Sequence, residues 1–312
     1  MKKLMTGLSR FRQRLFDMTL YGENMEYRTL ESTELIYIYE AFTQAFSDYQ
    51  VTIDMPYKAF ETNLKRNGYM PGVSVGAFNH EELVGIVLNG VRYWNGVKTI
   101  YDLGTGVIPS FRKRGITKEM LNMVQTVCQD KGIKRYQLEA IQENTAAVSL
   151  YKKQGFQVIR TLDCYMAERN DRKLGENKQW KVLHLQAFTP EQWELLKSFW
   201  DYAPSWQNSV DSVCAIADSF AYVLAEASGN LIGYGIINKL NGEIVQLAIR
   251  QEYRRLGVAT EIMWNLQKQT SSPKVKMINI DERDGALNAF LKQSGFRIFA
   301  KQYEMEKKLC IN

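Results

Sequence analysis

Histidine is scarce in this chain of 312 residues, which contains only His80 and His184. A histidine-rich metal site and a Ser-His-Asp hydrolase both depend on imidazole groups, so the scarcity argues against both. We therefore expect no bound metal ion.

Cysteine is also sparse, and its positions are scattered. No Cys-x-x-Cys pair occurs, so neither a disulfide framework nor a zinc-ligand pair is indicated. We interpret the thiols as reduced and mostly buried, as in a cytoplasmic protein. The four positions are Cys128, Cys164, Cys214 and Cys310.

Long apolar runs and blocks of positive charge are missing as well. No run approaches the length of a membrane span, and the net charge of +6 is not gathered in one basic block. We expect no nucleic-acid partner and no stable membrane association. Residues 1–24 form a basic extension without the apolar core of a signal peptide. We expect it to pack on or lie beside the first domain, with a helix on a membrane surface as the alternative.

The length suits two domains of about 150 residues each. Both halves follow the same order of predicted elements: strand, helix, antiparallel strands, helix, strand, helix, strand. This order predicts an α/β fold of two tandem domains, each a largely antiparallel mixed sheet with helices on both faces. The predicted domains are residues 25–168 and 180–312, joined by a polar linker over residues 169–179.

One short pattern occurs twice, about 140 residues apart, at Arg112–Thr117 and Arg254–Ala259. Each copy follows a strand-like run, opens an amphipathic helix, and is followed some 40 residues later by Gly-Phe (Gly155-Phe156 and Gly295-Phe296). A glycine turn at a helix N-terminus directs backbone N–H groups and basic side chains at one point. We therefore predict a diphosphate site, and the two copies in register indicate an internal duplication.

With these features the chain resembles a tandem member of the GNAT superfamily, the acyl-CoA-dependent N-acyltransferases. The first half carries the fuller set: Gly106–Pro109, the turn, Asn144, Leu150-Tyr151 and Gly155-Phe156. The resemblance implies that the turn holds the CoA pyrophosphate. It also implies that backbone amides of Thr105–Val107 bind the pantetheine arm and polarise the thioester carbonyl.

The resemblance therefore implies acetyl-CoA as cofactor and an amine as acceptor, either a small molecule or a peptide. The cofactor-binding residues that it implies are Thr105, Gly106, Val107, Arg112, Lys113, Arg114, Gly115, Ile116, Thr117, Asn144, Arg254, Arg255, Gly257 and Ala259.

The two halves depart from the family pattern in different places. The first turn ends in Thr117 instead of Gly or Ala, whereas the second turn matches at every slot. Counting back from Gly295, Leu291 occupies the position of Tyr151 and Asp284 that of Asn144. We therefore expect the first domain to be catalytic and the second to be degenerate.

N-acylation needs a neutral amine, an electrophilic thioester and a proton for the departing sulfur. By the resemblance, Tyr151 points at the thioester and is the expected general acid for the CoA thiolate. Glu139 and Asp102 are the candidate bases, because each lies on a strand beside the expected cleft. Asp48-Tyr49 is a candidate lining of the acceptor pocket. The aromatic stretch 199–206 is either a hydrophobic acceptor pocket or packing between the domains.

Three alternatives stay open from the sequence. The second domain, with the cleaner turn, is the catalytic one; or the protein binds acyl-CoA without catalysis, as a regulatory module; or it transfers an aminoacyl group from charged tRNA. The sequence also leaves open whether the chain forms a homodimer. Relatives that use charged tRNA lack the pyrophosphate turn, so two such turns weigh against that class. The acceptor itself leaves no signature, since one fold supports many substrates.

Overall fold

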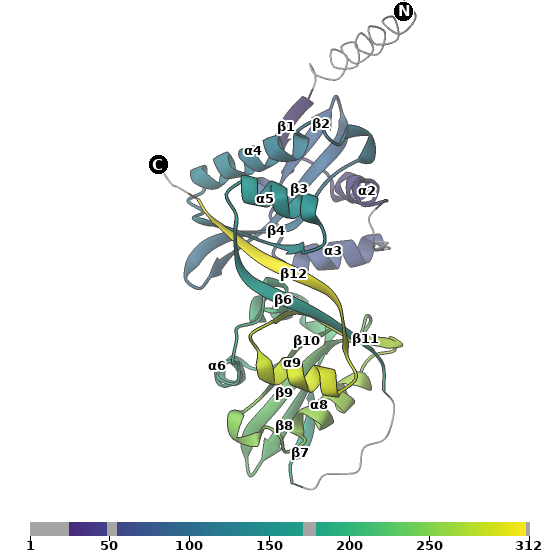
Figure 1. Ribbon diagram of the computed structural model, residues 1–312, viewed down its shortest axis with the longest axis vertical. Coiled ribbons are helices and arrows are strands. Elements are labelled where there is room, and N and C mark those ends of the chain that lie inside the picture. Colours follow the sequence, from purple (N-terminus) through teal and green to yellow (C-terminus); the bar gives the residue numbers. More distant parts are fainter. Residues whose placement is uncertain (1–24, 49–54, 171–178, 310–312) are drawn as a thin grey trace, which may run out of the picture. The chain divides into compact units, whose positions relative to one another are not determined.

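The computed structural model describes residues 25–48, 55–170 and 179–309 (Figure 1). The predicted N-terminal extension, Tyr49 and most of the predicted linker lie outside these ranges. The chain divides into two compact units, the first comprising residues 1–61, 69–136 and 308–312, and the second residues 62–68 and 137–307. In the described ranges, no helix has the length and apolar character needed to cross a membrane.

The first unit is built on antiparallel strands that are neighbours in chain order. These strands are β1 (Met25–Thr29), β2 (Val75–Asn79), β3 (Glu82–Trp94) and β4 (Val97–Val107). The helices α2 (Leu35–Ala45) and α4 (Ile116–Asp130) cover opposite faces of the strands (Figure 1). A Cβ on Gly106 of β4 would meet α2, while one on Gly85 of β3 would meet Ile116 and Met120 of α4.

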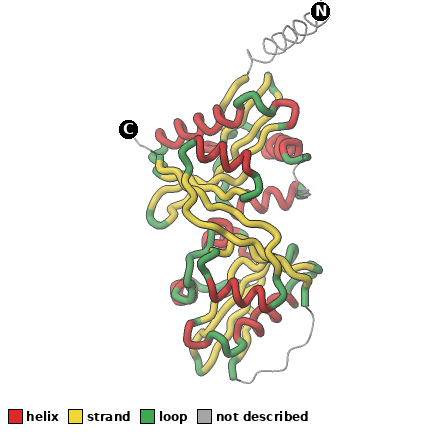
Figure 2. The backbone as a smooth tube through the Cα atoms, viewed as in Figure 1, coloured by secondary structure: helices red, strands yellow, loops and turns green. Residues whose placement is uncertain are grey.

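The second unit contains the remaining elements, which Figure 2 shows as helices beside strands. Its helices are α5 (Thr145–Lys153), α6 (Pro190–Lys197), α7 (Val210–Ala215), α8 (Val258–Gln267) and α9 (Gly285–Gln293), with the end of α3 (Tyr57–Arg66). Its strands are β5 (Arg135–Ile141), β6 (Gln157–Glu168), β7 (Lys181–Leu185), β8 (Phe220–Ala227), β9 (Asn230–Asn238), β10 (Ile244–Ile249), β11 (Lys274–Asp281) and β12 (Arg297–Lys308). Short 3₁₀ turns at residues 71–73, 109–111, 206–208, 217–219 and 251–253 complete the described elements.

Two apolar cores cover the two faces of β8, β9 and β10. Ile262 of α8 and Leu291 of α9 belong to one core, whereas Trp193 of α6 and Val213 of α7 belong to the other. This layering confirms the predicted α/β class with helices on both faces. A Thr189 capping box begins α6, and Pro190 stands at its first position.

The last strand of each sequence repeat pairs with strands of the other repeat. In the second unit the strand order is β5-β12-β6-β11. Thus β6, which ends the first repeat, is antiparallel to β11, and β12, which ends the second repeat, lies between β5 and β6. The two compact units therefore do not follow the two repeats of the sequence.

A buried ion pair holds the end of α3 within the second unit. Arg66 donates to Glu243 Oε1 at 2.8 Å, to Asn208 Oδ1 at 3.2 Å and to the Gln207 carbonyl oxygen at 3.1 Å. The side chains of Arg66 and Glu243 are only 8% and 5% exposed. Burial raises the pKa of Glu243, but the charges of Arg66 and Lys276 outweigh this effect and hold the pKa below its ordinary value. The carboxylate is therefore ionised in the interior and depends on its cationic partners.

Replacing Arg66 by methionine should lower the free energy of unfolding by about 3 kcal/mol, because Glu243 would stay buried with only Lys276 at 3.9 Å. Urea unfolding of the whole chain measures this. Lys58→Met breaks an exposed ion pair with Glu61 and should cost less than about 1 kcal/mol. Equal losses for the two variants would contradict the role given to the buried pair.

Candidate functional site

Strands β10 and β11 are joined by one isolated β-bridge just before β10 begins, and along their described lengths they do not pair beyond it. They share a parallel bridge at Glu243 and Lys276, where the Lys276 amide donates to the Gly242 carbonyl oxygen at 3.1 Å. Beyond this bridge, the pairing of β11 with β6 shifts register between Met277 and Ile280, and Asn279 adopts a left-handed φ of 62°. This bulge turns β11 away while β10 continues along β9.

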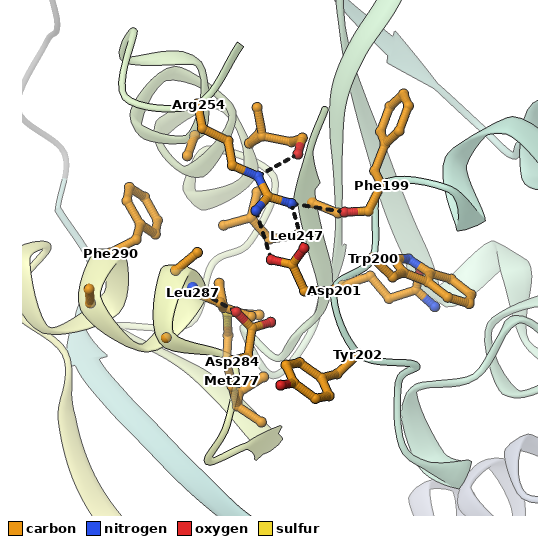
Figure 3. Close-up of a pocket in the computed structure, with 18 of the residues that line it drawn as sticks. Phe199, Trp200, Asp201, Tyr202, Leu247, Arg254, Met277, Asp284, Leu287 and Phe290 are labelled. Carbon is orange, nitrogen blue, oxygen red and sulfur yellow. Dashed lines mark hydrogen bonds and ion pairs between the residues drawn. The ribbon is translucent and has the colours of Figure 1, made fainter. Parts of the chain in front are cut away.

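A cavity of about 570 Å³ opens where the two strands separate (Figure 3). Its walls are the ends of β10 and β11, the start of α8, the helix α9, and the loop after α6. The lining residues that matter below are Asp201, Tyr202, Leu247, Arg254, Arg255, Gly257, Ala259, Asn279, Asp281 and Asp284. The size lies within the range of small-molecule and cofactor pockets.

The Arg254–Ala259 turn forms one end of this cavity. Arg255 and Gly257 both have left-handed backbones, with φ of 65° and 97°, and Gly257 is the N-cap of α8. No side chain caps this helix, so its first N–H groups are open to an anionic ligand. A Cβ on Gly257 would meet nothing within 4 Å, so glycine is required here by φ and not by lack of space.

The first arginine of the turn makes four hydrogen bonds to protein groups. Arg254 donates through Nε to the Ile249 carbonyl oxygen at 3.0 Å and through its terminal nitrogens to Asp201 at 2.7 and 3.2 Å. It also donates to the Phe199 carbonyl oxygen at 3.3 Å. Figure 3 shows this fork beside the cavity. Arg254 thus ties the turn to the loop after α6, and the backbone and Arg255 are left for an anion.

The first repeat has the same arrangement in its own turn. Arg112 donates to the Val107 carbonyl oxygen at 3.0 Å, to Asp48 at 2.7 Å through two nitrogens, and to the Ala45 carbonyl oxygen at 2.8 Å. Lys113 and Gly115 have φ of 63° and 82°, like Arg255 and Gly257. Hydrogen bonds from Arg112 hold the pKa of Asp48 below its ordinary value. Two turns built alike, down to the carboxylate, are what an internal duplication predicts.

The edge of β10 along residues 246–249 faces the cavity. β10 is the last strand of its sheet, and the Arg250 amide donates to the Ile232 carbonyl oxygen of β9 at 2.9 Å. Because strand residues alternate, the amides of Leu247 and Ile249 point to the opposite edge. The Ile249 carbonyl oxygen confirms this direction, since it accepts from Arg254 on that side. Leu247 is the counterpart of Thr105, and its N–H is available to a ligand carbonyl.

Carboxylates gather at the other end of the cavity. Asp284 caps α9 by accepting from the Leu287 amide at 2.9 Å. Burial raises the pKa of Asp284, and the nearby charges of Asp201 and Asp281 raise it further. Asp281 accepts two hydrogen bonds from Arg283, at 2.9 and 2.7 Å.

The predicted catalytic residues lie in different surroundings. Tyr151 is buried and packs edge to face on Phe156, with ring centroids 5.7 Å apart. Glu139 Oε2 accepts from Asn279 at 2.6 Å and from Gln207 at 2.8 Å. Their predicted roles stay predictions.

Asp102 and Asn144 both bind their own local backbone. Asp102 accepts from the Gly104 amide at 2.8 Å and from Thr105 Oγ1 at 2.7 Å, beside the bulge of β4. Asn144 caps α5 by accepting from the Ala147 amide at 3.1 Å. Asn144 and Asp284 are therefore equivalent helix caps.

The aromatic stretch of the second repeat divides between core and cavity. Phe199 and Trp206 are buried, and the Trp206 indole donates to the Asn67 carbonyl oxygen at 3.1 Å. Trp200 and Tyr202 line the cavity, and Phe199 belongs to its wall as well.

Sequence reasoning did not identify the roles of Asp201, Asn279 and Arg283. The pairing of Asp201 with Arg254 joins residues far apart in the chain, so no local spacing indicates it. Asn tolerates a left-handed backbone, but nothing in a strand-like run indicates that Asn279 adopts it.

The chain belongs to the acetyltransferase (GNAT) family, whose model matches residues 35–156 and 184–296. A curated relative, N-alpha-acetyltransferase 50 of Danio rerio, is 30% identical over 90 residues. This match spans 28% of the chain and about half, 54%, of that relative.

Among solved structures, the chain is similar to a tandem GNAT protein from the clavulanic acid biosynthesis pathway. The TM-score is 0.71 at 11% identity, over 92% of this chain and 99% of the other. A GCN5-related N-acetyltransferase from Sphaerobacter thermophilus gives 0.69 at 15% identity, over 92% and 96% of the two chains. At these identities the likeness shows the tandem GNAT fold.

Replacing Arg254 by alanine should lower the free energy of unfolding by about 2 kcal/mol, because Asp201 and two carbonyl groups lose their charged donor. Arg255→Ala is the matched control: it removes the neighbouring exposed side chain and keeps the left-handed backbone, so it should cost less than about 0.5 kcal/mol. Thermal and urea unfolding of both variants test this. Equal stabilities of Arg254→Ala and Arg255→Ala would contradict the stabilising role given to the hydrogen bonds of Arg254.

Proposed function

We propose that this protein transfers an acetyl group from acetyl-CoA to an amine, and that the cavity of the second repeat receives the cofactor. The observation that carries this proposal is the continuity of three features along one cavity: the open helix N-terminus at Gly257, the free edge of β10, and the far end with Asp284. A diphosphate, an extended amide arm and a thioester have this same order in acetyl-CoA.

Each part of the cofactor meets a group of matching chemistry. The diphosphate fits the N–H groups at the start of α8 and the charge of Arg255. The pantetheine arm carries amides that can pair with the edge of β10 as an added strand would. The Leu247 amide then lies beside the oxygen of the thioester carbonyl, and donates to the oxyanion that forms when the amine attacks.

This assignment gives the second repeat the catalytic role. The family model covers both repeats, and the Danio rerio relative is named as an N-alpha-acetyltransferase. A peptide N-terminus is therefore one acceptor class to test, beside small amines and amino sugars. Because the cavity belongs to one unit, the proposal needs no contribution from the other.

The turn of the first repeat supports a second candidate, a further acyl-CoA site. Lys113, Gly115 and the Arg112 brace repeat the geometry of the second turn. Thr117 stands where the second turn has Ala259, and its side chain is only partly exposed.

Calorimetric titration of acetyl-CoA should show that Gly257→Glu weakens binding about 100-fold, or ~2.7 kcal/mol, because a carboxylate then occupies the diphosphate position. Gly229→Glu is the matched control. Gly229 also has a left-handed φ of 79° and space for a Cβ, but lies in the β8–β9 turn. It should bind as the wild type does.

Gly115→Glu completes the set of variants. Loss of binding with Gly115→Glu alone would move the cofactor to the first repeat and contradict the assignment. Two wild-type sites, each removed by one variant, would establish both turns. A wild type that binds acetyl-CoA but acetylates no amine in the acceptor panel would favour a binding module over an enzyme.

A further inference from the structure

Tyr202 presents a phenol to the cavity from the loop that follows α6. Figure 3 shows its hydroxyl directed towards Met277 and Asp284. The residue is 36% exposed, and among the described residues its hydroxyl has no hydrogen-bond partner. A hydroxyl group in this position is available to a ligand.

Three arginines contact Tyr202 or the residues next to it. Arg254 binds Asp201, the residue before it, as described above. Arg160 donates to the carbonyl oxygen of Ala203, the residue after it, at 2.9 Å. The Arg283 guanidinium lies over the Tyr202 ring, 4.9 Å from its centroid.

The arginines that hold Tyr202 are themselves anchored by buried carboxylates. Asp281, only 3% exposed, binds Arg283 and lies 3.7 Å from Arg160. Glu304, 4% exposed, forms two hydrogen bonds with Arg160 at 2.6 and 2.7 Å. Although Tyr202 belongs to a loop, its ring is therefore held in place by arginines that form ion pairs with buried carboxylates.

The helix position expected to supply an acid offers none in this repeat. Leu291, the counterpart of Tyr151, has no exposed surface and belongs to the apolar core. Of the other hydroxyl groups that line the cavity, Tyr253 packs against that core beside the turn, and Thr260 has an aliphatic hydroxyl, which is a weak acid. Of the hydroxyl groups that line the cavity, Tyr202 therefore supplies the phenol at the end of the cavity away from the turn.

We propose that Tyr202 is the general acid of the second repeat. The inference rests on the proposed function. The amine nitrogen forms a bond to the thioester carbon, the carbon–sulfur bond breaks, and the sulfur takes the proton of the Tyr202 hydroxyl. The nitrogen releases one proton to solvent, and solvent returns one proton to the phenolate. The products are the N-acetyl amine and the CoA thiol, with no other reactant.

The test is the steady-state kinetics of Tyr202→Phe in the full chain, with acetyl-CoA and an acceptor that the wild type acetylates. We expect kcat to fall about 100-fold while the KM for acetyl-CoA changes less than about twofold, because general acids contribute in this range and the ring remains. Tyr93→Phe removes a phenol hydroxyl from an exposed residue of β3 and should match the wild type. Arg283→Gln removes the cation over the ring and should lower kcat in the same direction by a smaller factor.

The outcomes distinguish a failure of the Tyr202 role from a failure of the proposed function. An unchanged kcat for Tyr202→Phe would overturn the acid role, and so would a loss of calorimetric acetyl-CoA binding, which would make Tyr202 a binding residue. An unfolding midpoint shifted from that of the wild type would assign any defect to structure and overturn it likewise. A wild type that transfers no acetyl group, or whose transfer survives Gly257→Glu, would overturn the proposed function and this inference with it.

Discussion

The separation of β11 from β10 is the constraint on which the rest of the site depends. Two strands that stayed paired past Glu243 and Lys276 would leave no cavity and no free strand edge. The left-handed Asn279 makes the separation, and its buried amide is held by Glu139, Ser205 and Gln302. Polar groups that would be costly unpaired in the interior therefore fix the position of the bulge. Glu139, a candidate base from the sequence, is part of this support in the structure.

The first arginine of each turn is the second feature on which the site depends. In each repeat one arginine joins a carboxylate, a carbonyl group at or just after a helix end, and a strand end, and so fixes the turn that begins the next helix. The arginine that resembles a phosphate ligand in the sequence acts as a brace in the structure. The backbone amides and the next basic residue of each turn remain for an anion. The backbone is held before any ligand arrives, and such preorganisation favours binding and oxyanion stabilisation.

The sequence was sufficient for the repeats, the α/β class and the two turns, because these depend on local patterns: periodicity, and Gly115 and Gly257 at helix starts. It was not sufficient for the pairing of β6 with β11, since each strand has the same alternation whichever partner it takes. The pairs Arg254–Asp201 and Arg66–Glu243 also escaped prediction, because contacts between distant residues leave no spacing in a single sequence. The same holds for Tyr202, which the sequence places only within an aromatic cluster.

The central claim is that the cavity between β10 and β11 is the acyl-CoA site, and a crystal structure of the protein grown with acetyl-CoA tests it most directly. The account predicts density for the diphosphate at the Gly257 and Ala259 amides. It also predicts the arm along β10 and the thioester oxygen within hydrogen-bond distance of the Leu247 amide. Density confined to the turn of the first repeat, with the second cavity empty, would contradict it.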